Sequence, residues 1–219
     1  MPPKINQVYE PSFKSLGSFV PNDNHNIQIV WRNVILMTIL HVAAVYGSYL
    51  WMVEAKLQTV FLAYLLYVFS GMGITAGAHR LWSHKSYKAK LPLRILLMIM
   101  NSMALQNDIY EWSRDHRVHH KFSETNADPH NANRGFFFAH MGWLLCKKHP
   151  EVVIKGKTID MKDLLLDPVV QFQRRFYFPL IILCCFLLPA AIPYYFWNEN
   201  FFTAFYICSL FRYCFILVS

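Results

Sequence analysis

The sequence has few charged residues. Only 16% of its 219 residues are Asp, Glu, Lys or Arg, whereas 55% are hydrophobic and 16% are aromatic. A soluble domain ordinarily carries about a quarter charged residues, so this deficit argues against a soluble enzyme and indicates a membrane protein. The formal net charge is +8. Because apolar runs dominate the chain, this charge favours an anionic lipid surface or a phosphate-bearing substrate over nucleic acid.

The sequence also lacks a cysteine pattern for zinc or redox chemistry. None of its five cysteines forms a CxxC pair, and four of them lie in apolar runs, which predicts core packing and no disulfide bonds. Residues 1–26 are polar, contain prolines and lack the apolar core of a signal peptide. We therefore expect no cleavable signal peptide, and the first membrane span should direct insertion.

Four apolar stretches are long enough to cross a bilayer, which takes ~20 residues. They cover residues 34–53, 57–78, 177–197 and 201–218. Very short connections join the first to the second and the third to the fourth, which predicts two helical hairpins. A shorter apolar stretch at 91–103 contains Pro92 and Arg94. We expect it to lie in the membrane surface as an interfacial helix, because a crossing there would place the histidine groups on opposite sides of the membrane.

The distribution of basic residues predicts the orientation of the chain. Lys4, Lys14 and Arg32 precede the first span, whereas the first hairpin turn has a single lysine. By the positive-inside rule the N-terminus and the basic region 107–175 face the cytosol. The prediction is an all-α integral membrane protein with four transmembrane helices in two hairpins and a cytosolic helical cap. Residues 1–30 form a cytosolic segment, and residues 31–219 form the membrane and histidine domain.

Histidines are concentrated in two groups. His116, His119 and His120 have the i, i+3, i+4 spacing that places side chains on one face of a helix. Crowded imidazoles hinder one another's protonation, whereas neutral imidazole is a good metal ligand. His79 and His84 follow the second span, on the same predicted side of the membrane. The pattern favours a metal site, and a solvated, histidine-rich helix end is the alternative.

Five imidazoles exceed the three protein ligands that a catalytic zinc ion usually keeps, so two metal ions are the simpler explanation. An all-nitrogen, open, redox-capable site beside lipid indicates iron that handles dioxygen, the chemistry needed to attack an unactivated C–H bond. Glu124 and Asp128 are candidates for carboxylates that orient the imidazoles, with solvated turn residues as the alternative. His130 lies in a predicted turn next to these ligands.

The sequence resembles the membrane acyl-CoA desaturases of the stearoyl-CoA Δ9 type, the fatty acid desaturase type 1 family. The resemblance extends over residues 21–217 and is carried by residues 73–84, 107–112, 116–130, 134–138, 142–145 and 173–175. It implies an endoplasmic-reticulum enzyme with a di-iron centre. Such an enzyme uses dioxygen, and electrons from cytochrome b5 and its NADH-dependent reductase, to introduce a cis double bond into a fatty acyl-CoA.

The resemblance also implies roles for individual residues. The two histidine boxes of the family match the metal ligands His79, His84, His116, His119 and His120. Its contacts to the acyl-CoA head match Asn33, Asn107, Arg114, Asp115, Lys147 and Lys148. Cations attract phosphates at a cytosolic mouth, which agrees with the two lysines, although generic positive-inside charge is the alternative. Tyr64 and Tyr67 are candidates for setting acyl-chain length, with helix packing as the alternative.

Members of the family continue beyond the fourth span into a cytosolic region with a third histidine box, whereas this sequence stops at Ser219. We therefore expect a C-terminally shortened desaturase, whose five box histidines fill only part of two iron coordination spheres. The alternative function is a partner that binds acyl-CoA or full-length desaturase without turnover. The match at 107–112 argues against a related hydroxylase. The position of the histidines outside the spans argues against a metal transporter.

Overall fold

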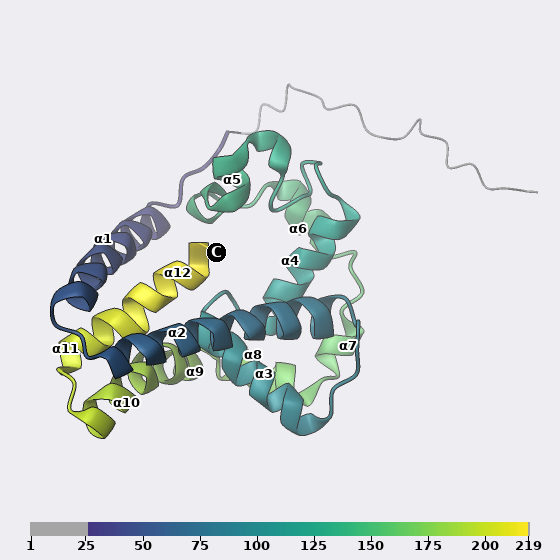
Figure 1. Cartoon of the computed structure of the whole chain (residues 1–219). Helices are drawn as coiled ribbons and strands as arrows, with labels where there is room; N and C mark the ends of the chain where they lie inside the picture. Colours follow the sequence, from purple (N-terminus) through teal and green to yellow (C-terminus); the bar gives the residue numbers. More distant parts are fainter. Residues whose placement is uncertain (1–25, 219) are drawn as a thin grey trace, which may run out of the picture.

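Helices are the main secondary structure in the part that the computed structural model describes, residues 26–218 (Figure 1). The one β feature in this range is an isolated antiparallel bridge between Ile29 and Cys146. Four helical segments are long and apolar enough to cross a membrane: Trp31–Val53, Leu57–Ser83, Tyr177–Trp197 and Phe201–Val218. The predicted all-α fold of a multi-pass membrane protein is confirmed. The second segment is longer than expected and includes His79.

Three of the four spans change helix type along their length. The first span is α1 (Trp31–Val53). Each of the others contains a π-helical part, in which hydrogen bonds skip one more residue than in an α-helix. The second span consists of α2 (Leu57–Met72) and η2 (Gly73–Ser83). The third is α9 (Tyr177–Ile181), η5 (Ile182–Leu187) and α10 (Leu188–Trp197), and the fourth is α11 (Phe201–Ala204), η6 (Phe205–Phe211) and α12 (Arg212–Val218).

The two hairpin turns are locked together at one end of the spans. The Lys56 ammonium donates to the carbonyls of Trp197 and Asn198, both at 2.7 Å. The buried Glu199 carboxylate accepts hydrogen bonds from the Lys56 backbone N–H and from the Thr59 hydroxyl. These contacts satisfy carbonyls at the end of α10 that have no partner within the helix. Both turns therefore lie on the same side of the molecule.

Arg212 joins the spans in the interior. Its guanidinium is 1% exposed and donates to the carbonyls of Cys208, Cys185 and Met103 and to the Ser70 hydroxyl. A charged side chain within a span must find polar partners inside the protein. These partners lie in η6, η5, α2 and α3 (Leu91–Ala104), so one side chain ties three spans to α3.

Helix α3 packs alongside the second span. Its first half exposes Leu91, Leu93, Ile95 and Leu96, whereas residues 100–104 are buried. The contact is closest at Gly73, where an added Cβ would lie 2.3 Å from the Met100 carbonyl carbon and the Asn101 nitrogen. The first half of α3 is thus largely apolar and open, which suits a helix at a membrane interface. Its placement in the membrane surface stays a prediction.

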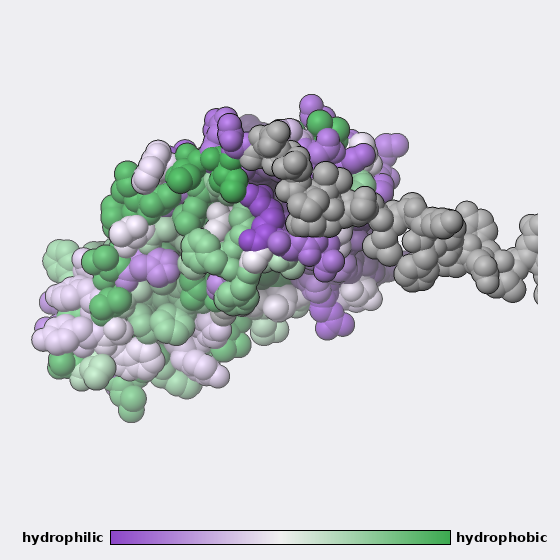
Figure 2. Space-filling view, turned by 90° about the horizontal axis from the view of Figure 1, so that it is seen from above, coloured by the Kyte–Doolittle hydropathy of each residue, from purple (hydrophilic) through white to green (hydrophobic). Residues whose placement is uncertain are grey.

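A polar cap follows α3. It contains α4 (Ile109–Lys121), η3 (Ala132–Arg134), α5 (Phe136–His140), η4 (Gly142–Leu145), α6 (Pro150–Gly156), α7 (Lys162–Leu165) and α8 (Pro168–Arg175). Figure 2 shows hydrophobic side chains over the part that holds the hairpins and hydrophilic ones over the part that holds the cap. This division matches a chain that sits in a bilayer at one end and faces water at the other. Residues 1–25 of the predicted N-terminal segment lie outside the described residues.

Candidate metal centre

The π-helix η2 brings His79 and His84 together. In an α-helix, residues five apart point about 140° away from each other around the axis. A π-helix has ~4.4 residues per turn, so the same residues lie only about 50° apart. The His84 N–H donates to the His79 carbonyl at 3.0 Å, which is the π-type bond itself. The two rings consequently meet edge to face, with centroids 4.5 Å apart.

Helix α4 supplies the second pair. Asp108 caps its N-terminus by accepting a hydrogen bond from the Glu111 N–H, a capping arrangement that fixes where a helix begins. The start of α4 sets the positions of His116 and His120, which are four residues apart and lie on one face. That face is turned toward η2. Side chains from two helices, 32 positions apart in sequence, therefore meet in one cluster.

Four imidazoles form this cluster. One ring nitrogen from each of His79, His84, His116 and His120 lies within 4.8 Å of the other three. His116 is at the centre, because its Nε2 is 3.0 Å from Nε2 of His84 and 3.0 Å from Nε2 of His120. A metal with bonds of about 2.1 Å at right angles places neighbouring ligand nitrogens about 3.0 Å apart. The spacing therefore suits a metal ion.

The electrostatics of the cluster also suit a metal ion. Burial lowers the pKa of His116 to about 3, and repulsion from His120, His79 and His84 adds to this effect. Burial and the neighbouring imidazoles His84 and His119 likewise lower the pKa of His120. His116 and His120 are therefore neutral at pH 7, the form that coordinates metals. The four clustered imidazoles thus form a candidate metal site.

His119 lies next to the four-histidine cluster, with its ring centroid 5.4 Å from that of His120. Its ring centroid is 6.1 Å from that of His116 and 5.7 Å from that of His130. Its Nδ1 is 2.8 Å from the buried Asp128 carboxylate, which also accepts the backbone N–H groups of Glu124 and His130. A carboxylate on one ring nitrogen is the usual partner of a metal-binding histidine and leaves Nε2 free. His119 is thus oriented separately, next to the cluster.

A cavity of about 470 Å³ adjoins the cluster. Its lining includes His116, His130 and three of the predicted substrate residues, Asn33, Asn107 and Asp115. The remaining lining comes largely from apolar residues of α1, α5, η4 and the fourth span. The Asn33 amide donates to the Leu144 carbonyl at 2.7 Å and so ties the first span to the cap.

A second cavity, of about 770 Å³, lies behind Asp115. Asp115 forms ion pairs with Arg114 and Lys148, and Arg114 also pairs with Glu111. Because Asp115 lines both cavities, this group of charges forms the wall between them. Lys148 lines the second cavity, whereas Lys147 lines neither. The two neighbouring lysines, which the sequence does not distinguish, therefore differ in whether they line a cavity.

Two residues near the cluster had no assigned role in the sequence. Trp112 stacks on His116, with centroids 4.8 Å apart and an interplanar angle of 25°, and it also lines the cavity of about 470 Å³. Trp112 lies four residues before His116, and this i, i+4 spacing predicts that the two side chains share a helix face. Arg117 lies between two histidines of α4, and its guanidinium reaches the Trp82 carbonyl of η2 and the Asp163 carboxylate. No sequence pattern reveals its partner, because the contact is with a backbone carbonyl of η2.

Comparison with known proteins identifies the family. The family model described as fatty acid desaturase matches residues 55–219. The chain is 61% identical to the Delta(9)-fatty-acid desaturase fat-6 of Caenorhabditis elegans over 99% of its own length and 61% of that protein. It is 59% identical to the acyl-CoA Delta-9 desaturase of Acheta domesticus over 90% of its length and 55% of that protein. It is 52% identical to the stearoyl-CoA desaturase 2 of Rattus norvegicus over 96% of its length and 57% of that protein.

The chain spans about three fifths of the length of the curated relatives it matches. The family match covers three of the four spans, the polar cap and all the clustered histidines. With helical hairpins that carry a cluster of four histidines at their polar end, this chain belongs to the fatty acid desaturase family.

Proposed function

We propose that this protein is an acyl-CoA desaturase that introduces a cis double bond, at the Δ9 position, into a saturated fatty acyl-CoA. The observation that carries the proposal is the cluster of four imidazoles, whose central member, His116, lines a cavity with both apolar and polar walls. Such a site suits a redox metal that acts on a hydrocarbon chain. The curated relatives named above are Δ9, acyl-CoA or stearoyl-CoA desaturases by name, which supports the same substrate class.

The proposed cofactor is a pair of iron ions. His79, His84, His116 and His120 would hold one iron, and the separate orientation of His119 by Asp128 suits it to a second, adjacent ion. Bound iron supplies the dioxygen chemistry that removes hydrogen from an unactivated C–H bond. The five histidines do not fill two coordination spheres, so the second ion needs further ligands.

The chain's own residues bind and orient the substrate. Asn33 and Asn107 line the mouth of the cavity near the cluster and suit the polar groups at the acyl end of the thioester. Arg114, Asp115 and Lys148 separate the two cavities and suit the CoA head, whose phosphates favour cations. The stacked Trp112 packs one face of His116 and limits the access of water to that ring.

The proposed setting is the endoplasmic-reticulum membrane, with the histidines facing the cytosol. Basic residues of the cap, at 107–175, support this orientation through the positive-inside rule. Electrons would come from cytochrome b5 and its NADH-dependent reductase, as the family resemblance implies. The alternative, a partner that binds acyl-CoA without turnover, is not favoured, because the relatives named above are desaturases.

The activity can be tested directly in membranes that contain this chain. With stearoyl-CoA, NADH and oxygen, we expect an 18-carbon product whose double bond mass spectrometry locates at the Δ9 position. Membranes with His84→Ala, which removes one ligand of the cluster, should form at least about 100-fold less product. Tight binding of stearoyl-CoA with no product above the His84→Ala level would contradict the desaturase proposal and support the partner alternative.

Reversing the charge of Lys148 should weaken acyl-CoA binding more than reversing that of Lys147. Lys148→Glu places a like charge beside Asp115 and removes a cation from the second cavity, whereas Lys147 lines neither cavity. We expect the dissociation constant of stearoyl-CoA to rise about 10-fold or more for Lys148→Glu, and about 3-fold or less for Lys147→Glu. Equilibrium binding with labelled ligand, at constant metal content, measures both. Equal effects would remove Lys148 from the site.

A further inference from the structure

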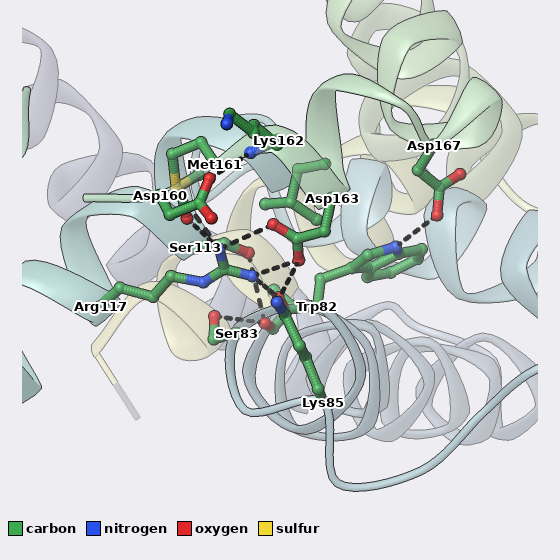
Figure 3. A network of polar contacts seen from close by, with 12 residues as sticks. Trp82, Ser83, Lys85, Ser113, Arg117, Asp160, Met161, Lys162, Asp163 and Asp167 are labelled. Carbon is green, nitrogen blue, oxygen red and sulfur yellow. Dashed lines mark hydrogen bonds and ion pairs between the residues drawn. The ribbon is translucent and has the colours of Figure 1, made fainter.

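Arg117 holds η2 against α4 from outside the metal cluster. Its guanidinium donates to the Trp82 carbonyl at 2.6 Å, to the Asp160 carbonyl at 2.8 Å and to both carboxylate oxygens of Asp163, at 3.0 and 2.7 Å (Figure 3). The side chain is only 13% exposed. A planar guanidinium can make several such bonds at fixed angles, and no other side chain can replace that geometry.

The Trp82 carbonyl is the contact that matters for the metal site. Trp82 lies in the last turn of η2, between the ligands His79 and His84. Carbonyls at the C-terminal end of a helix have no partner within the helix, so Arg117 satisfies one of them. Trp82 is also held by its side chain, because its indole N–H donates to the Asp167 carboxylate at 3.2 Å. Its backbone and ring are thus both fixed.

Arg117 is also anchored to α7 through Asp163. The Asp163 carboxylate accepts hydrogen bonds from two guanidinium nitrogens of Arg117. It also forms an ion pair with Lys85 at 3.1 Å. Burial raises the pKa of Asp163, but hydrogen bonds from Arg117 and Lys85 outweigh this effect and hold it at about 2. The carboxylate is therefore ionised at neutral pH. Asp163 belongs to α7. Arg117, on α4, therefore connects η2 to α7.

This arrangement places a fixed link between the two ligand pairs. His116 precedes Arg117 on α4, and His84 follows Trp82 by two residues. The distance between Nε2 of His84 and Nε2 of His116, 3.0 Å, consequently depends on how closely η2 is held to α4. Ser113, one turn before Arg117, makes a second polar contact between these helices outside the cluster, a 3.4 Å hydrogen bond to the Ala78 carbonyl. Arg117 is the stronger link.

We propose that Arg117 is a positioning residue of the metal site: by joining the Trp82 carbonyl to Asp163, it sets the separation between the His79–His84 pair and the His116–His120 pair. The inference rests on the proposed metal site. It predicts that the loss of Arg117 weakens metal binding although every ligand remains. Residues that orient metal ligands typically contribute about 10- to 100-fold to affinity.

The test is a cobalt(II) titration of the purified full chain in detergent, followed by the visible spectrum of the bound ion and by the melting temperature. We expect Arg117→Gln to bind cobalt at least about 10-fold more weakly and to change the visible bands, which report ligand geometry. Arg117→Lys keeps the charge but cannot bridge both partners, so its affinity should also fall. Arg80→Gln is the matched control, because it removes an exposed cation next to His79 and should leave affinity equal or higher.

Three results would decide against the inference. If Arg117→Gln lowers only the melting temperature and leaves cobalt affinity and spectrum unchanged, the residue is merely structural. If Arg117→Lys restores full affinity, the bridge is not needed. If Arg117→Gln does not fold, Asp163→Asn takes its place, and an unchanged affinity there overturns the proposal. Failure of the unaltered chain to bind cobalt would instead contradict the metal site itself.

Discussion

Replacing His116 with alanine will lower the metal affinity of the four-histidine cluster by at least about 100-fold, more than the loss of a residue that only orients a ligand. His116 is the central member, since its Nε2 lies 3.0 Å from ring nitrogens of two other members. Without it the remaining three imidazoles lose their common neighbour. The stacking contact between His116 and Trp112 is lost as well. Cobalt(II) titration and the iron content of the purified protein measure the effect.

Two further substitutions make this result specific. His41→Ala alters a histidine within α1 whose Nδ1 is 2.7 Å from the Met37 carbonyl, and it should leave metal affinity unchanged. His119→Ala should leave the four-histidine site intact and affect only a second ion, because His119 points toward Asp128. If His116→Ala binds cobalt as tightly as the unaltered chain, the four imidazoles do not form the site.

Replacing Gly73 with alanine will lower the free energy of unfolding by about 3 kcal/mol or more, at the upper end of the cost of overpacking a core. A Cβ at this position would lie 2.3 Å from two backbone atoms of α3. Backbone atoms cannot move aside as the end of a side chain can, so η2 and α3 would have to separate. Because η2 carries His79, we also expect weaker cobalt binding. Denaturation in detergent micelles measures the stability.

Gly71→Ala is the matched control, two residues earlier in the same span. The nearest atom to an added Cβ there is the Ile216 Cδ1, at 3.4 Å, the end of a flexible side chain. Alanine also favours the helix over glycine by about 1 kcal/mol, so this variant should be neutral or stabilised. Equal stability of the two variants would mean that η2 and α3 are not in close contact at Gly73.

The fold could be read from the sequence to a large extent. Long apolar runs predict membrane spans because the cost of burying charge in lipid acts on each segment separately. The four spans and their pairing into hairpins agree with the structure. The end of the second span was wrong by five residues. Hydropathy falls at His79 and Arg80, whereas the helix continues as far as Ser83 because α3 and α4 pack against it.

The sequence by itself determined which helix face His116 and His120 share, because histidine spacing is local and the repeat of a helix is enough to group these two residues. Tertiary structure decided the rest. It converted the His79–His84 spacing into a shared face through a π-helix, turned His119 toward Asp128, and placed Lys148, but not Lys147, in a cavity. It also joined Arg117 to the Trp82 carbonyl. These features depend on contacts between distant segments, whose geometry no local periodicity encodes.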